Sequence, residues 1–315
     1  MSGTKHEMTH LPGGVPGDIC LGAPLPERER EYSPSSCISG HYQPFIAAYR
    51  QRSAQARHAA AAAGGRWSRH SYGEAPMQGI ELCLPAAAAA SRPTALLLFV
   101  HGGYWQELSA ADSLFAAAAC IERGFAFAAL DYTLAPAATL TNIIDESRQA
   151  LAWIGTHAAA LGIDRERIVI AGSSAGAHLS AMMALPHAGL GPATPGGARI
   201  TPRAVVLVSG IYWLEPLIGT SIDEALRLSR ETAHAASPAL HPLVGFPPAL
   251  VCWGEIETSA FKQQSRHFAA RLREAGTPCE LLEVPRRNHF DVILGLADET
   301  TALGRGTLGF MGFMG

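Results

Sequence analysis

Short apolar runs recur along this chain between longer segments that have helical periodicity. Runs such as ALLLFV at 95–100 and AVVLVS at 204–209 are apolar almost throughout, which is typical of strands buried on both faces. Strands of this kind that alternate with amphipathic helices predict a parallel sheet covered by helices on both sides. The expected fold class is therefore α/β, with a doubly wound, mostly parallel sheet.

The periodicity predicts where the elements of this sheet lie. The expected strands are residues 95–100, 125–130, 168–171, 204–209, 249–253 and 280–284. The expected helices are residues 44–58, 110–123, 142–161, 175–185 and 261–275. Ligands of such sheets bind beyond the carboxyl ends of the strands. The residues that follow each strand are therefore the candidates for a functional site.

A G-x-S-x-G motif, GSSAG at 172–176, follows one expected strand and precedes a helix. This strand-turn-helix context is the one in which the motif presents a nucleophilic serine, with glycines where side chains would clash. The start of the following helix adds a positive dipole end. We predict that Ser174 is the nucleophile, and we keep Ser173 as the neighbouring alternative.

A second candidate, HGGYW at 101–105, directly follows the apolar strand 95–100. Acyl transfer requires backbone N–H groups aimed at the oxyanion of the tetrahedral intermediate, and glycines let the backbone approach closely. We expect the amide of Gly103, joined by Gly102 or Tyr104, to act with the amide of Ala175 as an oxyanion hole. His101 is expected to organise this loop.

A nucleophilic serine requires a base and a carboxylate that orients the base. In α/β-hydrolases the chain order is serine, acid, histidine. His289, after the last expected strand, is the predicted base for Ser174. The predicted acid is Glu257, in the loop after 249–253; Glu255 and Asp291 remain alternatives.

Composition excludes several other functions. The net charge is −3 and no basic block exists, which argues against nucleic-acid binding. No apolar run approaches the ~20 residues of a membrane span, and the N-terminus lacks a signal-peptide stretch. The six cysteines show no CxxC spacing, and no His/Asp/Glu cluster has metal-ligand spacing. We expect a cytoplasmic enzyme with a small-molecule substrate and neither metal nor cofactor. Whether it forms a homodimer is left open.

Several segments together resemble one family, the α/β-hydrolase kynurenine formamidases and their bacterial arylformamidase relatives, which are related to hormone-sensitive-lipase-like esterases. The matching segments are YSPS at 32–35, YGE at 72–74, HGGYW at 101–105, DYTLAP at 131–136, GSSAGAHL at 172–179, SGIYWLEPL at 209–217, SP at 237–238, FKQQSRHF at 261–268 and NHFDV at 288–292. They span roughly residues 31–300.

The resemblance implies hydrolysis of N-formylkynurenine to kynurenine and formate, without metal. Its nucleophile, acid and base fall on Ser174, Glu257 and His289. The family usually has His where this chain has Ser173, Asp where it has Glu257, and Asp where it has Trp213.

The same residues would serve a short-chain carboxylesterase, which is the alternative function. Trp105, Tyr212 and Trp213, with Tyr104, are expected to form aromatic walls around an aryl leaving group. Arg286 and Arg287 are candidates for pairing with a substrate carboxylate.

The domain organisation expected from the sequence is simple. Residues 1–30 are interpreted as a flexible tail, part of which could order against the body. Residues 31–315 are expected to form a single hydrolase domain. A small helical cap should draw on residues 31–65 and 211–240.

Overall fold

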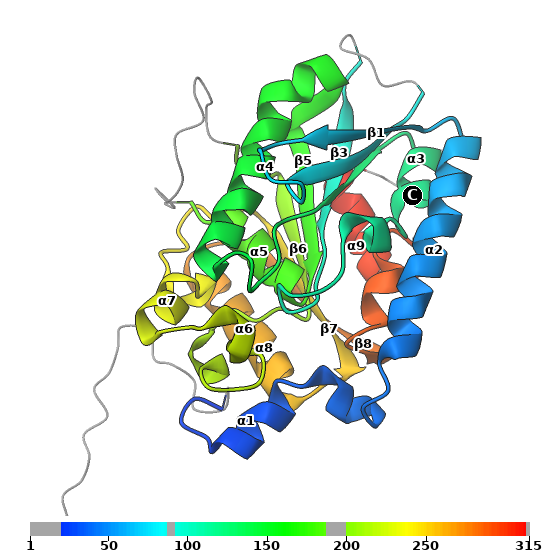
Figure 1. Ribbon diagram of the computed structural model, residues 1–315. Coiled ribbons are helices and arrows are strands. Elements are labelled where there is room, and N and C mark those ends of the chain that lie inside the picture. The colour runs from blue at the N-terminus through cyan, green and yellow to red at the C-terminus, as the bar shows by residue number, and fades with distance from the viewer. Residues whose placement is uncertain (1–19, 87–91, 187–199, 313–315) are drawn as a thin grey trace, which may run out of the picture.

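The computed structural model describes residues 20–86, 92–186 and 200–312. Its centre is an eight-stranded sheet in the order β1-β2-β4-β3-β5-β6-β7-β8, parallel from β4 to β8 (Figure 1). The strands are β1 (Arg66–Ser71), β2 (Gly79–Leu84), β3 (Thr94–Val100), β4 (Ala126–Leu130), β5 (Ile163–Ser173), β6 (Ala204–Val208), β7 (Ala249–Ile256) and β8 (Cys279–Asn288). The predicted doubly wound, mostly parallel sheet is confirmed.

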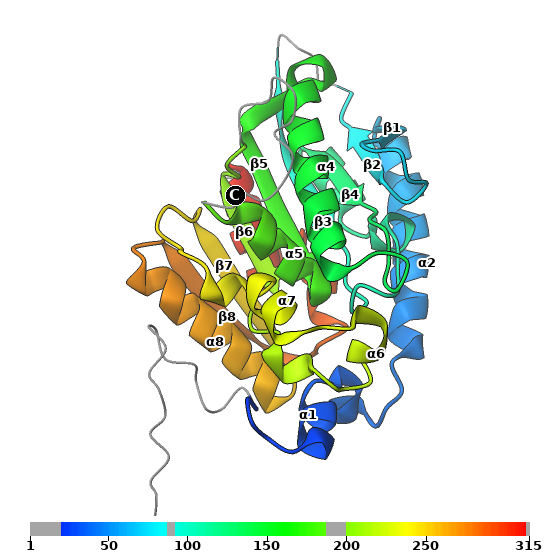
Figure 2. The same ribbon diagram turned by 60° about the vertical axis from the view of Figure 1, so that its left-hand side comes forward.

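Helices cover both faces of this sheet (Figures 1 and 2). The α-helices are α1 (Leu25–Glu31), α2 (Gln43–Ala62), α3 (Ala117–Glu122), α4 (Leu140–Leu161), α5 (Ala175–Ala184), α6 (Asp223–Leu226), α7 (Arg230–Ala235), α8 (Ser259–Glu274) and α9 (Ala302–Met311). Short 3-10 helices are η1 (Pro34–Ile38), η2 (Ala110–Ser113), η3 (Glu215–Leu217), η4 (Pro238–Leu240) and η5 (Val292–Gly295). Within the described ranges, none of the helices is both long and apolar enough to cross a membrane.

Strand β3 shows why its sequence is apolar at every position from Ala95 to Val100. Successive side chains of a strand point to opposite faces, and each face of β3 enters a separate buried cluster. Helices α4, α5 and α8 close the first cluster, whereas α2, α3 and α9 close the second. Leu96, Leu98 and Val100 belong to the first cluster, and Ala95, Leu97 and Phe99 to the second.

The register of the parallel strands brings their carboxyl ends to one edge. Val100 of β3 pairs with Gly172 of β5, and Val208 of β6 pairs with Cys252 of β7. The last residues of β7 and β8 are paired in the same way. The segments that follow these strands therefore meet at one place, as the sequence predicts.

Two local features differ from the sequence expectation. Strands β1 and β2 are antiparallel additions at the edge, and the polar, partly exposed sequence of β1 (RWSRHS) gave no apolar signal. The helix expected over 110–123 is broken into η2 and α3. Between them, the amide of Leu114 donates to Oγ of Ser53 at 2.9 Å instead of continuing the helical pattern.

Part of the expected tail over residues 1–30 orders against the body, as the sequence left open, whereas residues 1–19 lie outside the described residues. Residues 25–31 form α1, which is attached to the body by polar contacts. The Arg28 guanidinium donates to the carbonyls of Pro216 and Ile218 at 2.8 and 2.5 Å. The Oγ of Thr258 donates to the carbonyl of Glu31 at 2.5 Å. These contacts are long-range in sequence, so no local pattern reveals them.

The segments expected to form a cap lie in two different places. Helices α1 and α6 lie beside each other near the carboxyl edge of the sheet, with α7 close by (Figure 2). Helix α2 instead covers a sheet face, where Tyr49 and Ala60 pack in the same cluster as α3. The part of the expected cap that corresponds to α2 therefore belongs to the helical layer on one face of the sheet and not to a cap.

Candidate active site

Ser174 sits in the sharp turn between β5 and α5, with backbone angles φ 56° and ψ −120°. A positive φ is strained for a residue with a side chain. The flanking glycines make the turn feasible. A Cβ at Gly172 would lie 2.2 Å from the carbonyl oxygen of Gly176, and one at Gly176 would lie 2.0 Å from that of Val100. The spacing of the G-x-S-x-G motif is thus explained by three backbone segments in close contact.

Free backbone N–H groups lie on both sides of this turn. The amide of Ser174 itself is not free, because it donates a hydrogen bond to the carbonyl of Val208 at 2.8 Å. Ala175 is the first residue of α5, so its amide has no intrahelical acceptor. The amides of Gly102 and Gly103 likewise have no acceptor within the described part of the chain. A Cβ at Gly102 would lie 2.9 Å from the Ser173 carbonyl oxygen, which shows how closely the two loops approach.

His101 and Tyr132 hold the loop that carries Gly102 and Gly103. The His101 imidazole stacks on the Tyr132 ring with centroids 4.3 Å apart, and the Tyr132 hydroxyl donates to the His101 carbonyl at 3.0 Å. Burial lowers the pKa of His101, so the ring is neutral at neutral pH. His101 therefore occupies the organising position expected from the sequence.

His289 and Glu257 are joined directly, although they follow different strands. Nδ1 of His289 lies 2.9 Å from Oε2 of Glu257, and both side chains are buried. The other carboxylate oxygen, Oε1, accepts from Oγ of Ser209 and from the Gly254 amide, each at 2.6 Å. A carboxylate fixed at three points holds the imidazole in one tautomer, with Nε2 left to act as base.

The two alternative acids lie elsewhere. Oε2 of Glu255 accepts from the Arg286 amide at 2.7 Å, and Glu255 is exposed. The Asp291 carboxylate accepts from the Asn288 amide at 2.7 Å and pairs with Arg287 at 3.3 Å. Of the candidate carboxylates, Glu257 is the one that the structure brings to His289.

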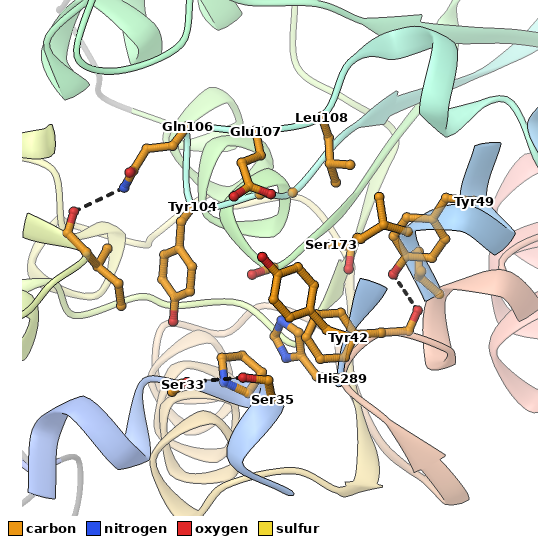
Figure 3. Close-up of a pocket in the computed structure, with 18 of the residues that line it drawn as sticks. Ser33, Ser35, Tyr42, Tyr49, Tyr104, Gln106, Glu107, Leu108, Ser173 and His289 are labelled. Carbon is orange, nitrogen blue, oxygen red and sulfur yellow. Dashed lines mark hydrogen bonds between the residues drawn. The ribbon is translucent and has the colours of Figure 1, made fainter. Parts of the chain in front are cut away.

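Ser174 and His289 line the same cavity, which has a volume of about 370 Å³. Figure 3 shows His289 at this cavity. Within the described residues, no hydrogen bond joins the Ser174 hydroxyl to the imidazole. Such catalytic bonds are often long without substrate and tighten in the complex. Ser173 also lines this cavity.

Aromatic side chains form much of the cavity wall. The rings of Tyr42 and Phe290 stack with centroids 5.7 Å apart, and the Tyr49 hydroxyl donates to the Phe290 carbonyl. Tyr104 faces the cavity from the loop after β3 (Figure 3). Its hydroxyl donates to the carbonyl of Tyr32. Flat rings of this kind suit an aryl group.

The expectation that Trp105, Tyr212 and Trp213 line the substrate site is wrong. Their exposed fractions are 0%, 0% and 2%, and none of them lines the cavity. Trp105 packs edge-on against His178 at 5.0 Å, and Tyr212 stacks on Phe268 at 4.2 Å. The sequence places these residues near the strand ends, but their side chains turn into the core.

The two arginines beside His289 do not reach the cavity either. Arg286 and Arg287 are exposed on β8 and are absent from the cavity lining. Across the described residues there is also no group of three or more His, Cys, Asp or Glu side chains placed to hold a metal ion.

Sequence reasoning from the strand ends missed one wall of the cavity. Residues of α1, η1 and α2 supply it, and they precede the first strand in the chain. The signal that could have identified it was the YSPS segment at 32–35, because Tyr32, Ser33 and Ser35 line the cavity. The missed residues are Glu29, Tyr42, Ile46 and Tyr49 from this wall and Phe99, Gln106, Glu107, Leu108, Ser113, Ser221, Ile222, Phe290 and Ile293 from other segments.

A serine at a strand-to-helix turn, free amides beside it and a histidine paired with a carboxylate on later strands are the features of an α/β-hydrolase. A family described as "alpha/beta hydrolase fold" matches residues 97–292. The chain belongs to this alpha/beta hydrolase fold family.

Individual relatives include formamidases and esterases. The chain is 28% identical to the kynurenine formamidase of Danio rerio over 237 residues, 74% of this chain and 77% of that protein. It is 28% identical to the esterase LipC of Mycobacterium tuberculosis over 248 residues, 73% and 61% of the two chains. The crystal structure of a candidate thioesterase from Silicibacter sp. tm1040 has a TM-score of 0.73 at 30% identity, covering 89% of this chain and 98% of that one. The resemblance to kynurenine formamidases and related esterases is confirmed.

Proposed function

We propose that the protein is a serine hydrolase that removes a small acyl group from an arylamide, with N-formylkynurenine as the most suitable substrate. The observation that carries the proposal is the cavity shared by Ser174 and His289, together with the hydrogen bond between the imidazole and the buried Glu257. The similarity to the Danio rerio kynurenine formamidase supports the choice of a formamide.

In the proposed reaction, Oγ of Ser174 attacks the acyl carbonyl while Nε2 of His289 accepts the hydroxyl proton. Glu257 stabilises the imidazolium through Nδ1. The amides of Gly103 and Ala175, with that of Gly102 or Tyr104, hold the oxyanion. The imidazolium then donates its proton to the leaving amine and the C–N bond breaks. Water, deprotonated by His289, releases the acyl group and restores the serine.

The dimensions of the cavity support a small acyl group with an aryl leaving group. A volume of about 370 Å³ is at the low end of the range for ligand pockets. Tyr42, Phe290 and Tyr104 supply rings on which an aryl group could stack. Tyr104 keeps the role that the sequence assigned to it, and Tyr42 and Phe290 take the role assigned to Trp105, Tyr212 and Trp213.

A short-chain carboxylesterase is the second candidate function. The similarity to the esterase LipC favours it, and the same Ser174, Glu257 and His289 would carry out the reaction. The two functions differ in the leaving group, an amine in one and an alcohol in the other.

The test is hydrolysis of N-formylkynurenine and of p-nitrophenyl esters of increasing acyl length by the wild type and by Ser174→Ala. We expect a kcat/KM on the formamide at least equal to that on the best ester, and loss of both activities in the variant. Activity on esters alone would replace the formamidase by the esterase. Full activity in Ser174→Ala would overturn both.

A further inference from the structure

The charged side chains around the cavity all have the same sign. Glu29 and Glu107 contribute carboxylates, and no lysine or arginine is among the lining residues that the structure describes. The two carboxylates differ in their partners. Glu29 accepts from the amide and Oγ of Ser221 at 2.6 and 2.9 Å. The Glu107 carboxylate has neither a hydrogen bond nor an ion pair within the described residues. Glu107 is therefore available to a ligand.

The position of Glu107 is fixed by the same loop that carries the candidate oxyanion donors. Its amide donates to the Gly103 carbonyl at 3.0 Å. A Cβ added at Gly103 would lie 3.1 Å from the Cβ of Glu107. Leu108, the next residue, has a φ of 71°, so the chain turns sharply after Glu107. In Figure 3 the side chain extends from this loop into the space between Tyr104 and Ser173.

An exposed, unpaired carboxylate in a cavity that is also lined by aromatic rings favours a cation for two independent reasons. A carboxylate attracts a positive charge electrostatically, whether or not the cation carries an N–H group. The faces of tyrosine rings, here Tyr42 and Tyr104, also attract cations. A ligand carboxylate would be repelled by Glu107 and would meet no lysine or arginine among the described lining residues.

We infer that Glu107 is a specificity-determining residue that selects substrates whose leaving group carries a positively charged amine. The inference rests on the proposed function, in which the acyl group is small and uncharged, so the charge belongs to the leaving group. N-formylkynurenine meets this condition through its ammonium group, whereas its carboxylate finds no cationic partner in the cavity lining.

A matched pair of acetate esters tests this selection. The cationic ester is 3-acetoxyphenyltrimethylammonium, and the neutral one is 3-tert-butylphenyl acetate, which has nearly the same shape. In Glu107→Gln we expect kcat/KM for the cationic ester to fall about tenfold, equal to about 1.4 kcal/mol, mainly through KM. The value for the neutral ester should stay within about twofold, since the amide keeps the size of the side chain. Glu280→Gln, at an exposed position at the start of β8, is the matched control and should change neither value.

A binding measurement provides a readout that does not depend on turnover. Calorimetry on the Ser174→Ala protein should show phenyltrimethylammonium binding at least tenfold more tightly than benzoate. Adding Glu107→Gln should remove this preference. Benzoate binding as tightly as the cation would overturn the inference.

The kinetic outcomes separate this inference from the proposed function. An unchanged ratio of the two esters in Glu107→Gln, with hydrolysis lost in Ser174→Ala, would overturn the role of Glu107 and leave the serine hydrolase in place. Hydrolysis of both esters that persists in Ser174→Ala would overturn the proposed function, and with it the assignment of the cation to a leaving group.

Discussion

The hydroxyl of Ser209 donates a 2.6 Å hydrogen bond to Oε1 of Glu257, the carboxylate oxygen that does not face His289. The Gly254 amide donates to the same oxygen. A Cβ at Gly254 would lie 2.4 Å from the Arg287 carbonyl, so the backbone can take this position only without a side chain. The longer side chain of glutamate, compared with aspartate, is thus held at its end by Ser209, directly after β6, and by Gly254 of β7.

Removing the Ser209 hydroxyl should therefore affect turnover through Glu257. We expect kcat of Ser209→Ala to fall about tenfold, since a hydrogen bond to a charged group contributes about 1.5–3 kcal/mol. KM should be unchanged, because Ser209 does not line the cavity. The assay is steady-state kinetics per active site, titrated with an organophosphonate. A loss of titratable sites instead of kcat would indicate a folding role.

The choice between the two neighbouring glutamates predicts a second contrast. Glu257→Gln keeps the size of the side chain but removes the charge that stabilises the imidazolium, so kcat should fall by about 10³-fold or more. Glu255→Gln is the matched control, because Glu255 bonds to the Arg286 amide and is exposed. A near-normal rate in Glu257→Gln together with an inactive Glu255→Gln would reverse the assignment of the acid.

The glycines of the turn around Ser174 predict a stability contrast. Gly176→Ala would place a Cβ 2.0 Å from the Val100 carbonyl oxygen, and the free energy of unfolding should fall by about 3 kcal/mol or more. Gly309→Ala, within α9, meets open space and should raise it by about 0.5–1 kcal/mol. Urea unfolding of both variants measures the difference. Equal stability of the two variants would contradict the account of the turn.

His178 predicts a pH dependence of stability. Burial lowers its pKa to about 4, against 6.5 for an exposed histidine, and Nε2 lies 2.7 Å from the Ala236 carbonyl. The unfolded chain binds a proton at this histidine more tightly than the folded protein does. The free energy of unfolding therefore includes a stabilising contribution from His178 above pH 6.5. That contribution, of about 3 kcal/mol at most, is lost as the pH falls to 4.

Urea unfolding between pH 4 and 7 tests this sign. The free energy of unfolding of the wild type should decrease more steeply toward pH 4 than that of His178→Gln, in which the group cannot titrate. Parallel curves for the two proteins would show that His178 does not carry the effect.

The sequence alone determined the six parallel strands of the sheet, β3 to β8, and the residues at their carboxyl edge. Apolar runs such as 95–100 are a local signal, because a strand buried on both faces must be apolar at every position. The G-x-S-x-G turn and the order serine, acid, histidine are also readable locally, since glycine spacing and strand ends define them. Ser174, Glu257 and His289 could therefore be named before any coordinates.

Only the tertiary structure decided which side chains surround the cavity. Trp105 and Trp213 follow strands, as a site residue should, but long-range packing against His178 and other buried side chains turns them inward. The wall that they were expected to form comes instead from segments before the first strand and from Phe290. Contacts such as Arg28 to Pro216 join residues 188 positions apart. No periodicity encodes such a contact, because it depends on where the whole sheet places the two segments.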